Sequence, residues 1–299
     1  MKSGLHFDMP MADYLSLPAA GSSTLATLDS QSAYHAWYGS FLNPSRVRDN
    51  SSETDNGTIA HALLLEGSED NLEVIDAPDW RTKAAKESRD AAYASGKTPI
   101  LAGKIQPIRD MVESVRRWVD QSEVKGIFQN GNAEVTGLWE ENGAQFRLRA
   151  DWLTTDQSII LDLKTTATNA NPQAFIRQLL SMNYDIQAAL YCRGMEKLTG
   201  KRPKFIFLVA ENKPPYACSL VGLAPSMLDL ADSKVDQAIT QWSECLKARK
   251  WPAYPMRICW AECPSWELAK FKERDILSQD TGLIPGTGTY TPDPDAGQI

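Results

Sequence analysis

The chain has 299 residues, 42% of them hydrophobic and 23% charged, with a formal net charge of −7. This composition is ordinary for a soluble globular protein, and no run of about twenty apolar residues is present to span a membrane. The acidic balance argues against a surface that binds nucleic acid everywhere, but it leaves room for a local basic channel.

The first part of the chain is predicted to be loop-like and then helical. Residues 1–30 are polar, with the run PAAGSS, and we expect no regular structure there. Four later stretches have the apolar spacing or the capping residues of helices: 31–41, 57–67 with His61 inside it, 79–96 with Asp79 as the N-cap, and 104–122.

The period of the apolar residues then changes from helical to alternating. Three consecutive strands are predicted, at 133–141, 144–153 and 158–166. Further elements follow in chain order: a helix opened by Asn171-Pro172 and broken near Asn183, strands at 204–211 and 216–223, and a helix from Pro225 to about Arg249. The order predicts a mixed α/β core with a helical N-terminal part. The last residues, rich in Gly, Pro and Thr, are expected to be disordered.

Charged residues lie where two of these strands end. Asp151 is near the end of the second strand, in RADWL, and Asp162 and Lys164 are on the third, in LDLKTT. Asp162 and Lys164 are two residues apart, so they leave the same face, and a tight hairpin would bring Asp151 beside them. Crowded carboxylates repel each other, and a hard divalent cation such as Mg²⁺ relieves that repulsion. A water on that cation can attack phosphorus, with Lys164 orienting the water or stabilising charge.

The residues alone leave a plainer interpretation open. An Asp-x-Lys pair on a strand is also typical of a solvated edge or a salt bridge. The five cysteines, at 192, 218, 245, 259 and 263, are odd in number and scattered, which argues against a disulfide framework. The segment MKSGLHFDMPMADY has no apolar core typical of a secretory signal, so we expect a cytoplasmic protein.

Several motifs around this group resemble those of one nuclease superfamily. RADWL and LDLKTT look like the PD-(D/E)xK motif, with Asp151 as the first acid and Asp162-x-Lys164 as the second half. DIQAALY looks like the QxxxY motif of the RecB-like branch, formed here by Gln187 and Tyr191. Residues four apart share a helical face, so this amide and phenol are expected to contact one DNA strand.

Further residues extend the resemblance. His61, in GTIAHALLLEG, matches the helix histidine that joins the metal site in that branch, and Glu134 matches an acidic residue found just upstream of the first motif. The resemblance implies that His61, Asp151, Asp162 and the backbone carbonyl of Leu163 hold the metal. Glu134 would join Asp151, Asp162 and Lys164 as a catalytic residue. The hydroxyl of Thr165 is a further candidate for holding a phosphate of the DNA.

The sequence most closely resembles the phage exodeoxyribonuclease VIII (RecE-like) nuclease domains. This implies a restriction-endonuclease-like mixed β-sheet core flanked by helices, with the nuclease domain at 1–265 and a C-terminal extension at 266–299. It also implies Mg²⁺-dependent digestion of double-stranded DNA ends, with Mn²⁺ as a substitute, to leave tails for recombination by a single-strand annealing protein. Processive relatives form rings around DNA, so a homo-oligomer is expected.

The chain departs from the family pattern in two places. Ala150 stands where the motif name has proline, a position that varies widely. Relatives with an iron–sulfur cluster have one Cys near the N-terminus, whereas this chain has none before Cys192, so we expect no cluster. Two alternatives stay open: a structure-specific or single-strand endonuclease of the same superfamily, and a DNA-binding protein without turnover.

Overall fold

The computed structural model describes residues 2–46, 56–67 and 69–281. The chain divides into two compact units, Met1–Ala253 and Tyr254–Ile299. The predicted disorder of the last residues falls on 282–299, outside the described residues. No helix in the described part of the chain combines the length and apolarity needed to cross a bilayer.

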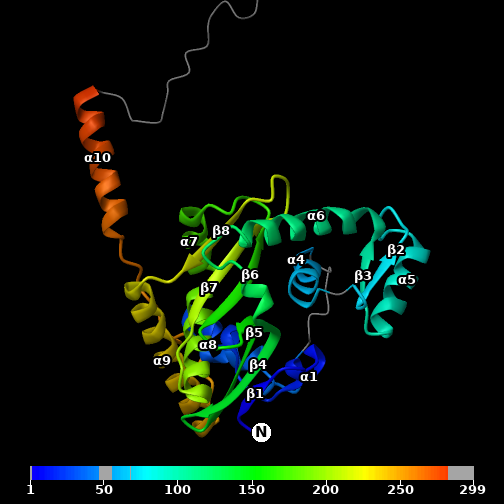
Figure 1. Cartoon of the computed structure of the whole chain (residues 1–299). Coiled ribbons are helices and arrows are strands. Elements are labelled where there is room, and N and C mark those ends of the chain that lie inside the picture. The colour runs from blue at the N-terminus through cyan, green and yellow to red at the C-terminus, as the bar shows by residue number, and fades with distance from the viewer. Residues whose placement is uncertain (1, 47–55, 68, 282–299) are drawn as a thin grey trace, which may run out of the picture. The chain divides into compact units, whose positions relative to one another are not determined.

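A six-stranded sheet forms the centre of the first unit, in the order β1-β4-β5-β6-β7-β8 (Figure 1). Its strands are β1 Gly4–His6, β4 Gly131–Glu141, β5 Ala144–Thr154, β6 Ile159–Thr166, β7 Lys204–Glu211 and β8 Cys218–Gly222. All neighbours pair antiparallel except β6 and β7, which run parallel. The parallel pair needs a crossover connection, and two helices between β6 and β7 supply it.

Helices cover both faces of this sheet. In chain order the helical segments are α1 Met11–Ser16, α2 Ser22–Ser30, α3 Ala33–Tyr38, α4 Asn56–His61, the π-helical turn η1 Ala62–Glu66, α5 Lys83–Ala94, α6 Ala102–Val119, the 3₁₀ turn η2 Ile127–Gln129, α7 Pro172–Ser181, α8 Tyr184–Thr199, α9 Pro225–Ala248 and α10 Ser265–Thr281. On one face α2, α8 and α9 bury a core that includes Phe146, Phe207 and Trp242. On the other, α4 and α6 bury a second core with Leu163 and Leu208.

The expected helix at 104–122 is confirmed as α6, and its apolar spacing gives a buried face formed by Ile105, Ile108, Met111, Val112, Val115 and Val119. Asn171 caps α7 as predicted, since its side chain accepts a hydrogen bond from the Gln173 amide at 2.9 Å. The break near Asn183 is also present, with this residue at φ 54° between α7 and α8. These features are local, so the sequence pattern was enough to predict them.

Two expectations for the N-terminal part are wrong. Residues 1–30 are not loop-like: β1 pairs with β4, and α2 buries Leu25 and Leu28 in the first core. These elements are short, so their few apolar residues give little periodicity. Asp79 does not cap the next helix, because α5 begins at Lys83 with Thr82 as the cap, accepting from the Ala85 amide at 3.2 Å.

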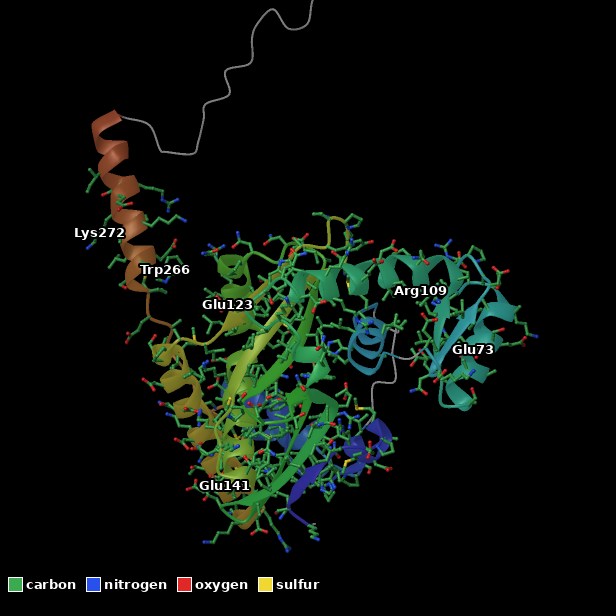
Figure 2. All side chains as sticks on the ribbon, viewed as in Figure 1. Glu73, Arg109, Glu123, Glu141, Trp266 and Lys272 are labelled. Atoms are coloured by element: carbon green, nitrogen blue, oxygen red, sulfur yellow. The ribbon has the colours of Figure 1, made fainter. Side chains whose placement is uncertain are left out.

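The structure also has a small lobe at one end of α6 that the sequence did not predict. Strands β2 Leu72–Ile75 and β3 Thr98–Leu101 pair in parallel and are connected through α5 (Figure 1). Arg109 on α6 holds the lobe through an ion pair with Glu69, 2.6 Å between Nη2 and Oε2. Figure 2 shows Arg109 on α6 beside this lobe and Glu73 within it.

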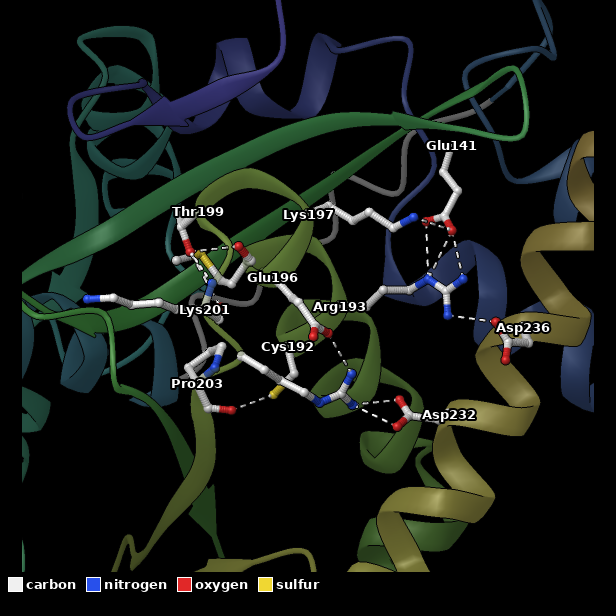
Figure 3. Close-up of polar contacts among 12 residues, drawn as sticks. Glu141, Cys192, Arg193, Glu196, Lys197, Thr199, Lys201, Pro203, Asp232 and Asp236 are labelled. Atoms are coloured by element: carbon white, nitrogen blue, oxygen red, sulfur yellow. Dashed lines mark hydrogen bonds and ion pairs between the residues drawn. The ribbon is translucent and has the colours of Figure 1, made fainter.

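Ion pairs fasten α8 between β4 and α9 (Figure 3). Arg193 on α8 contacts Glu141 on β4 at 2.7 Å and Asp236 on α9 at 2.6 Å, and Arg202 contacts Asp232 at 2.7 Å. Burial alone would raise the pKa of Glu141, but Arg193 and Lys197 lower it below its ordinary value. The helix that carries Gln187 is therefore held by charged contacts as well as by the core.

The second unit contains α10. Figure 2 labels Trp266 and Lys272 on this helix. Trp266 and Phe271 are exposed, as is Trp260 before the helix.

Candidate active site

The candidate site begins where β5 and β6 separate. The two strands pair directly only at Trp152–Leu161 and Leu153–Ile160. Asp151 is the next residue along β5. Its side chain replaces the backbone pairing at this point, because Oδ2 accepts a hydrogen bond from the Leu163 amide at 2.9 Å. A carboxylate that accepts a backbone N–H keeps that amide satisfied while the strands diverge. The divergence opens the sheet beside Asp151.

The alternation of side chains along β5 changes at Asp151. Ala150 packs in the first core, whereas Trp152 packs in the second. Glu134, opposite Asp151 in the β4–β5 register, has φ 56°, the left-handed region that non-glycine residues rarely adopt. Such a conformation persists only where the surrounding structure imposes it, and it often marks a functional site.

His61 closes the site from the end of α4. Its Nε2 lies 2.8 Å from the Leu163 carbonyl oxygen, and its Nδ1 lies 3.3 Å from Asp151 Oδ2. His61, Glu134 and Asp151 each offer one ligand atom, and these three atoms lie within 4.8 Å of one another. The structure therefore brings one imidazole and two carboxylates together, with the Leu163 carbonyl beside the imidazole.

The electrostatics of this group favour a cation. Burial first, and then the nearby Asp162 carboxylate, raise the pKa of Asp151 to about 7, against the opposing effect of His61 and Lys164. One nitrogen of the His61 ring lies beside the Leu163 carbonyl and the other beside the Asp151 carboxylate, and a neutral imidazole offers the lone pair of one nitrogen to a cation. Nitrogen and oxygen donors without thiolates suit a divalent ion such as Mg²⁺ or Mn²⁺.

Asp162 and Lys164 occupy the adjoining face of β6. Lys164 Nζ lies 2.5 Å from Asp162 Oδ2, and Gln187 on α8 joins both, donating to Asp162 Oδ1 at 2.7 Å and accepting from Lys164 at 3.2 Å. The Lys164 ammonium also lies 4.6 Å above the ring of Tyr184. Burial would lower the pKa of Lys164, but Asp162 and Asp151 raise it. Asp162, only 1% exposed, tolerates its burial because both of its oxygens are engaged.

The structure thus divides the predicted site residues into two adjoining groups. His61, Glu134 and Asp151 form one, while Asp162 lies outside it and pairs with Lys164 and Gln187. The groups are still close enough for Asp162 to act on the Asp151 carboxyl. The predicted role of Asp162 as a metal ligand stays a prediction.

The residues predicted to contact DNA are engaged within the protein. Gln187 is bonded to the two charged residues of β6. Tyr191, one turn further along α8, is buried, and its ring meets that of Phe205 edge to face with the centroids 5.9 Å apart. Thr165 is half-buried on β6, beside Lys164. DNA contact by these three residues stays a prediction, and the geometry shows that Gln187 supports the Asp162–Lys164 pair.

Two supporting residues did not stand out in the sequence. Arg149 on β5 forms a short ion pair with Glu134 and donates to the Met9 carbonyl at 2.8 Å. Tyr14 on α1 lies below the guanidinium of Arg149, 5.5 Å from ring centroid to Cζ. Arg149 stands two residues before Asp151, a position that could have drawn attention, whereas no signal links Tyr14 to a site more than a hundred residues away.

Comparisons with known proteins bear on this fold. A family model described as a PDDEXK-like domain of unknown function (DUF3799) matches residues 40–262. The structure is similar to that of a candidate exonuclease from Eubacterium rectale, with a TM-score of 0.53, 13% sequence identity, and coverage of 88% of this chain and 98% of that one. At this identity the likeness shows the fold alone. No curated protein sequence matches the chain.

A second solved structure is an alkaline exonuclease from Laribacter hongkongensis. It has 13% identity to this chain, covering 56% of it and 86% of the other, and its TM-score of 0.26 is too low to carry an argument. The expected fold class, a mixed α/β core flanked by helices, is confirmed by the six-stranded sheet and by the family match.

Proposed function

The chain belongs to the DUF3799 family of PDDEXK-like domains, and from this premise we propose that it is a metal-dependent deoxyribonuclease. The single observation that carries the proposal is the convergence of His61, Glu134 and Asp151 within 4.8 Å, beside a buried Asp162–Lys164 pair. An acid pair alone is common on protein surfaces. An imidazole, two acids and a buried lysine at the point where two strands separate fit phosphodiester hydrolysis.

His61, Glu134, Asp151 and the Leu163 carbonyl would hold the divalent ion. When bound, the ion supplies Lewis acidity and a more acidic water. The Leu163 amide holds Asp151 in place through its bond to Oδ2, and Arg149 holds Glu134. Asp162 joins the ligand set only if one of its oxygens gives up its contact with Lys164 or Gln187 and binds the ion instead.

Lys164 acts as a positive charge in this proposal. Its pKa is raised, so the ammonium stays protonated at neutral pH and cannot accept a proton from water. It can donate hydrogen bonds to an attacking water or to the phosphate oxygen that gains charge. Gln187 and the Tyr184 ring fix the direction of the ammonium.

Within this class we propose an exonuclease that digests linear double-stranded DNA with Mg²⁺ or Mn²⁺ as its ion. The support is the resemblance to RecE-like domains and the name of the Eubacterium rectale neighbour. The same resemblance supports a ring-forming homo-oligomer and a single-strand annealing protein as the partner that takes up the tails.

The test uses linear and covalently closed circular duplex DNA, each with Mg²⁺ and with EDTA. We expect loss of the linear DNA alone, only with metal, and none with Lys164→Ala. Lys247→Ala, which removes a lysine near the end of α9, is the matched control and should keep full activity. Cutting of the circles would identify an endonuclease instead. Binding of DNA without any metal-dependent cleavage would identify a protein without turnover and refute the proposed catalysis.

A further inference from the structure

Helix α7 buries one face and exposes apolar side chains on the other. Phe175 and Leu179 are buried, whereas Ile176 is 44% exposed, Leu180 41%, and Met182, just after the helix, 56%. Ile176 and Leu180 are four residues apart and so share one outer stripe of the helix. Single exposed apolar residues are normal, but two on one short helix and a third at its C-terminal end mark a candidate binding surface. We call Ile176, Leu180 and Met182 the α7 surface.

Aromatic rings connect α7 to the candidate active site. Phe175 stacks on Tyr184 with the ring centroids 6.1 Å apart, and the Lys164 ammonium lies 4.6 Å above the same Tyr184 ring. α7 is also the first helix after β6, the strand that carries Asp162 and Lys164 (Figure 1). Lys164 is therefore connected to the buried face of α7 through two successive aromatic contacts.

The charges of this segment fit a polyanion. Residues 163–184 contain no Asp or Glu, although the whole chain has 38, and they include Lys164 and Arg177. Arg177 is exposed on α7 and has no ion-pair partner among the residues that the structure describes. A guanidinium in this position can bind a phosphate while neighbouring apolar side chains meet the faces of bases.

The same features argue against a protein partner on this surface. A stable protein interface buries about 800 Å² on each side, and the three side chains of the α7 surface cover much less. A patch without carboxylates also has nothing that repels the phosphates of a nucleic acid.

We propose that the α7 surface binds the bases of single-stranded DNA next to the cleaved phosphate, with Arg177 on a neighbouring phosphate. The inference rests on the proposed nuclease function, because the position of the substrate strand follows from Lys164. The α7 surface adds a contact with unpaired bases to a site whose other residues act on the sugar–phosphate backbone of the DNA. Bases stacked in a duplex do not offer their faces to a side chain, so the surface acts on a strand end that has separated.

The test measures binding without hydrolysis. Fluorescence anisotropy in EDTA compares a labelled oligothymidine with an abasic oligonucleotide of equal length, which keeps the phosphates and lacks the bases. We expect the unaltered protein to prefer the oligothymidine. The double variant Ile176→Gln/Leu180→Gln should lose about fivefold or more of its affinity for the oligothymidine and keep its affinity for the abasic strand. Leu230→Gln, at an apolar residue of α9 that is 49% exposed, is the matched control.

Two outcomes overturn the inference. The first is a double variant that keeps the preference for bases or loses both affinities equally. The second is a variant with a smaller oligomeric mass and an unchanged base preference, which would assign the α7 surface to self-association. If thermal unfolding shows the double variant to be misfolded, Met182→Gln, which lies outside the helix, takes its place with the same criteria. Cleavage of linear DNA with Mg²⁺, assayed in parallel, separates failure of this inference from failure of the proposed function.

Discussion

Replacing Asp151 by Asn should stabilise the metal-free protein at neutral pH. The pKa of Asp151 is raised from 3.8 in the unfolded chain to about 7 in the folded protein, first by burial and then by Asp162. The folded state therefore binds the proton more tightly, and stability falls as the pH rises from about 4 to about 7. A difference of about three pKa units corresponds to about 4 kcal/mol at 1.36 kcal/mol per unit. Asn does not ionise, and its side-chain oxygen can still accept a hydrogen bond from the Leu163 amide. The variant therefore avoids the loss of folding stability as the pH rises.

Urea unfolding in EDTA across this pH range measures the effect. The free energy of unfolding of Asp151→Asn should match that of the unaltered protein near pH 4 and exceed it by up to about 4 kcal/mol above pH 7. Asp229→Asn, at an exposed carboxylate of α9, controls for the loss of one charge and should show little difference. A difference for Asp151→Asn that is constant with pH, or a destabilised variant at pH 8, would refute the argument. Adding Mg²⁺ should stabilise the unaltered protein and leave the variant unchanged.

Three further predictions concern two residues near this carboxylate and one ion pair elsewhere in the first unit. Gln187→Ala should lower kcat by about 10- to 100-fold with little change in the KM for DNA, because Gln187 orients Lys164; steady-state kinetics would check this. Glu141→Gln should destabilise the protein by about 3 kcal/mol at pH 7, because Arg193 loses its buried partner. That loss should vanish in urea unfolding as the pH falls below the ordinary carboxyl range, since the pKa of Glu141 is lowered in the folded state. His61→Ala should weaken Mn²⁺ binding about tenfold or more, as measured by calorimetry. A variant that binds Mn²⁺ as tightly as the unaltered protein would exclude His61 as a ligand.

The sequence was most informative where structure depends on neighbours in the chain. The hairpins from β4 to β6 followed from alternating apolar residues, and they predicted that Asp151 lies near Asp162. The cap at Asn171 is local in the same way. The spacing of Asp162 and Lys164 put both on one face, which their direct ion pair confirms.

Long-range contacts could not be predicted in this way. The parallel pairing of β2 and β3 joins segments on either side of α5. The left-handed conformation of Glu134 and its ion pair with Arg149 depend on the folded geometry of two neighbouring strands. Gln187 was expected to contact DNA because its motif suggested it, but its bonds to Asp162 and Lys164 follow from the packing of α8 on the sheet. Each of these features depends on residues that become neighbours only in the folded chain.

We propose that His61, Glu134, Asp151 and the Leu163 carbonyl together bind one divalent ion. Crystals of the protein grown with Mn²⁺, and measured at a wavelength where manganese scatters anomalously, test it most directly. We expect an anomalous peak within bonding distance of all four groups, and no such peak in crystals of Asp151→Asn. A peak coordinated by other residues, or none at this position in the unaltered protein, would contradict it.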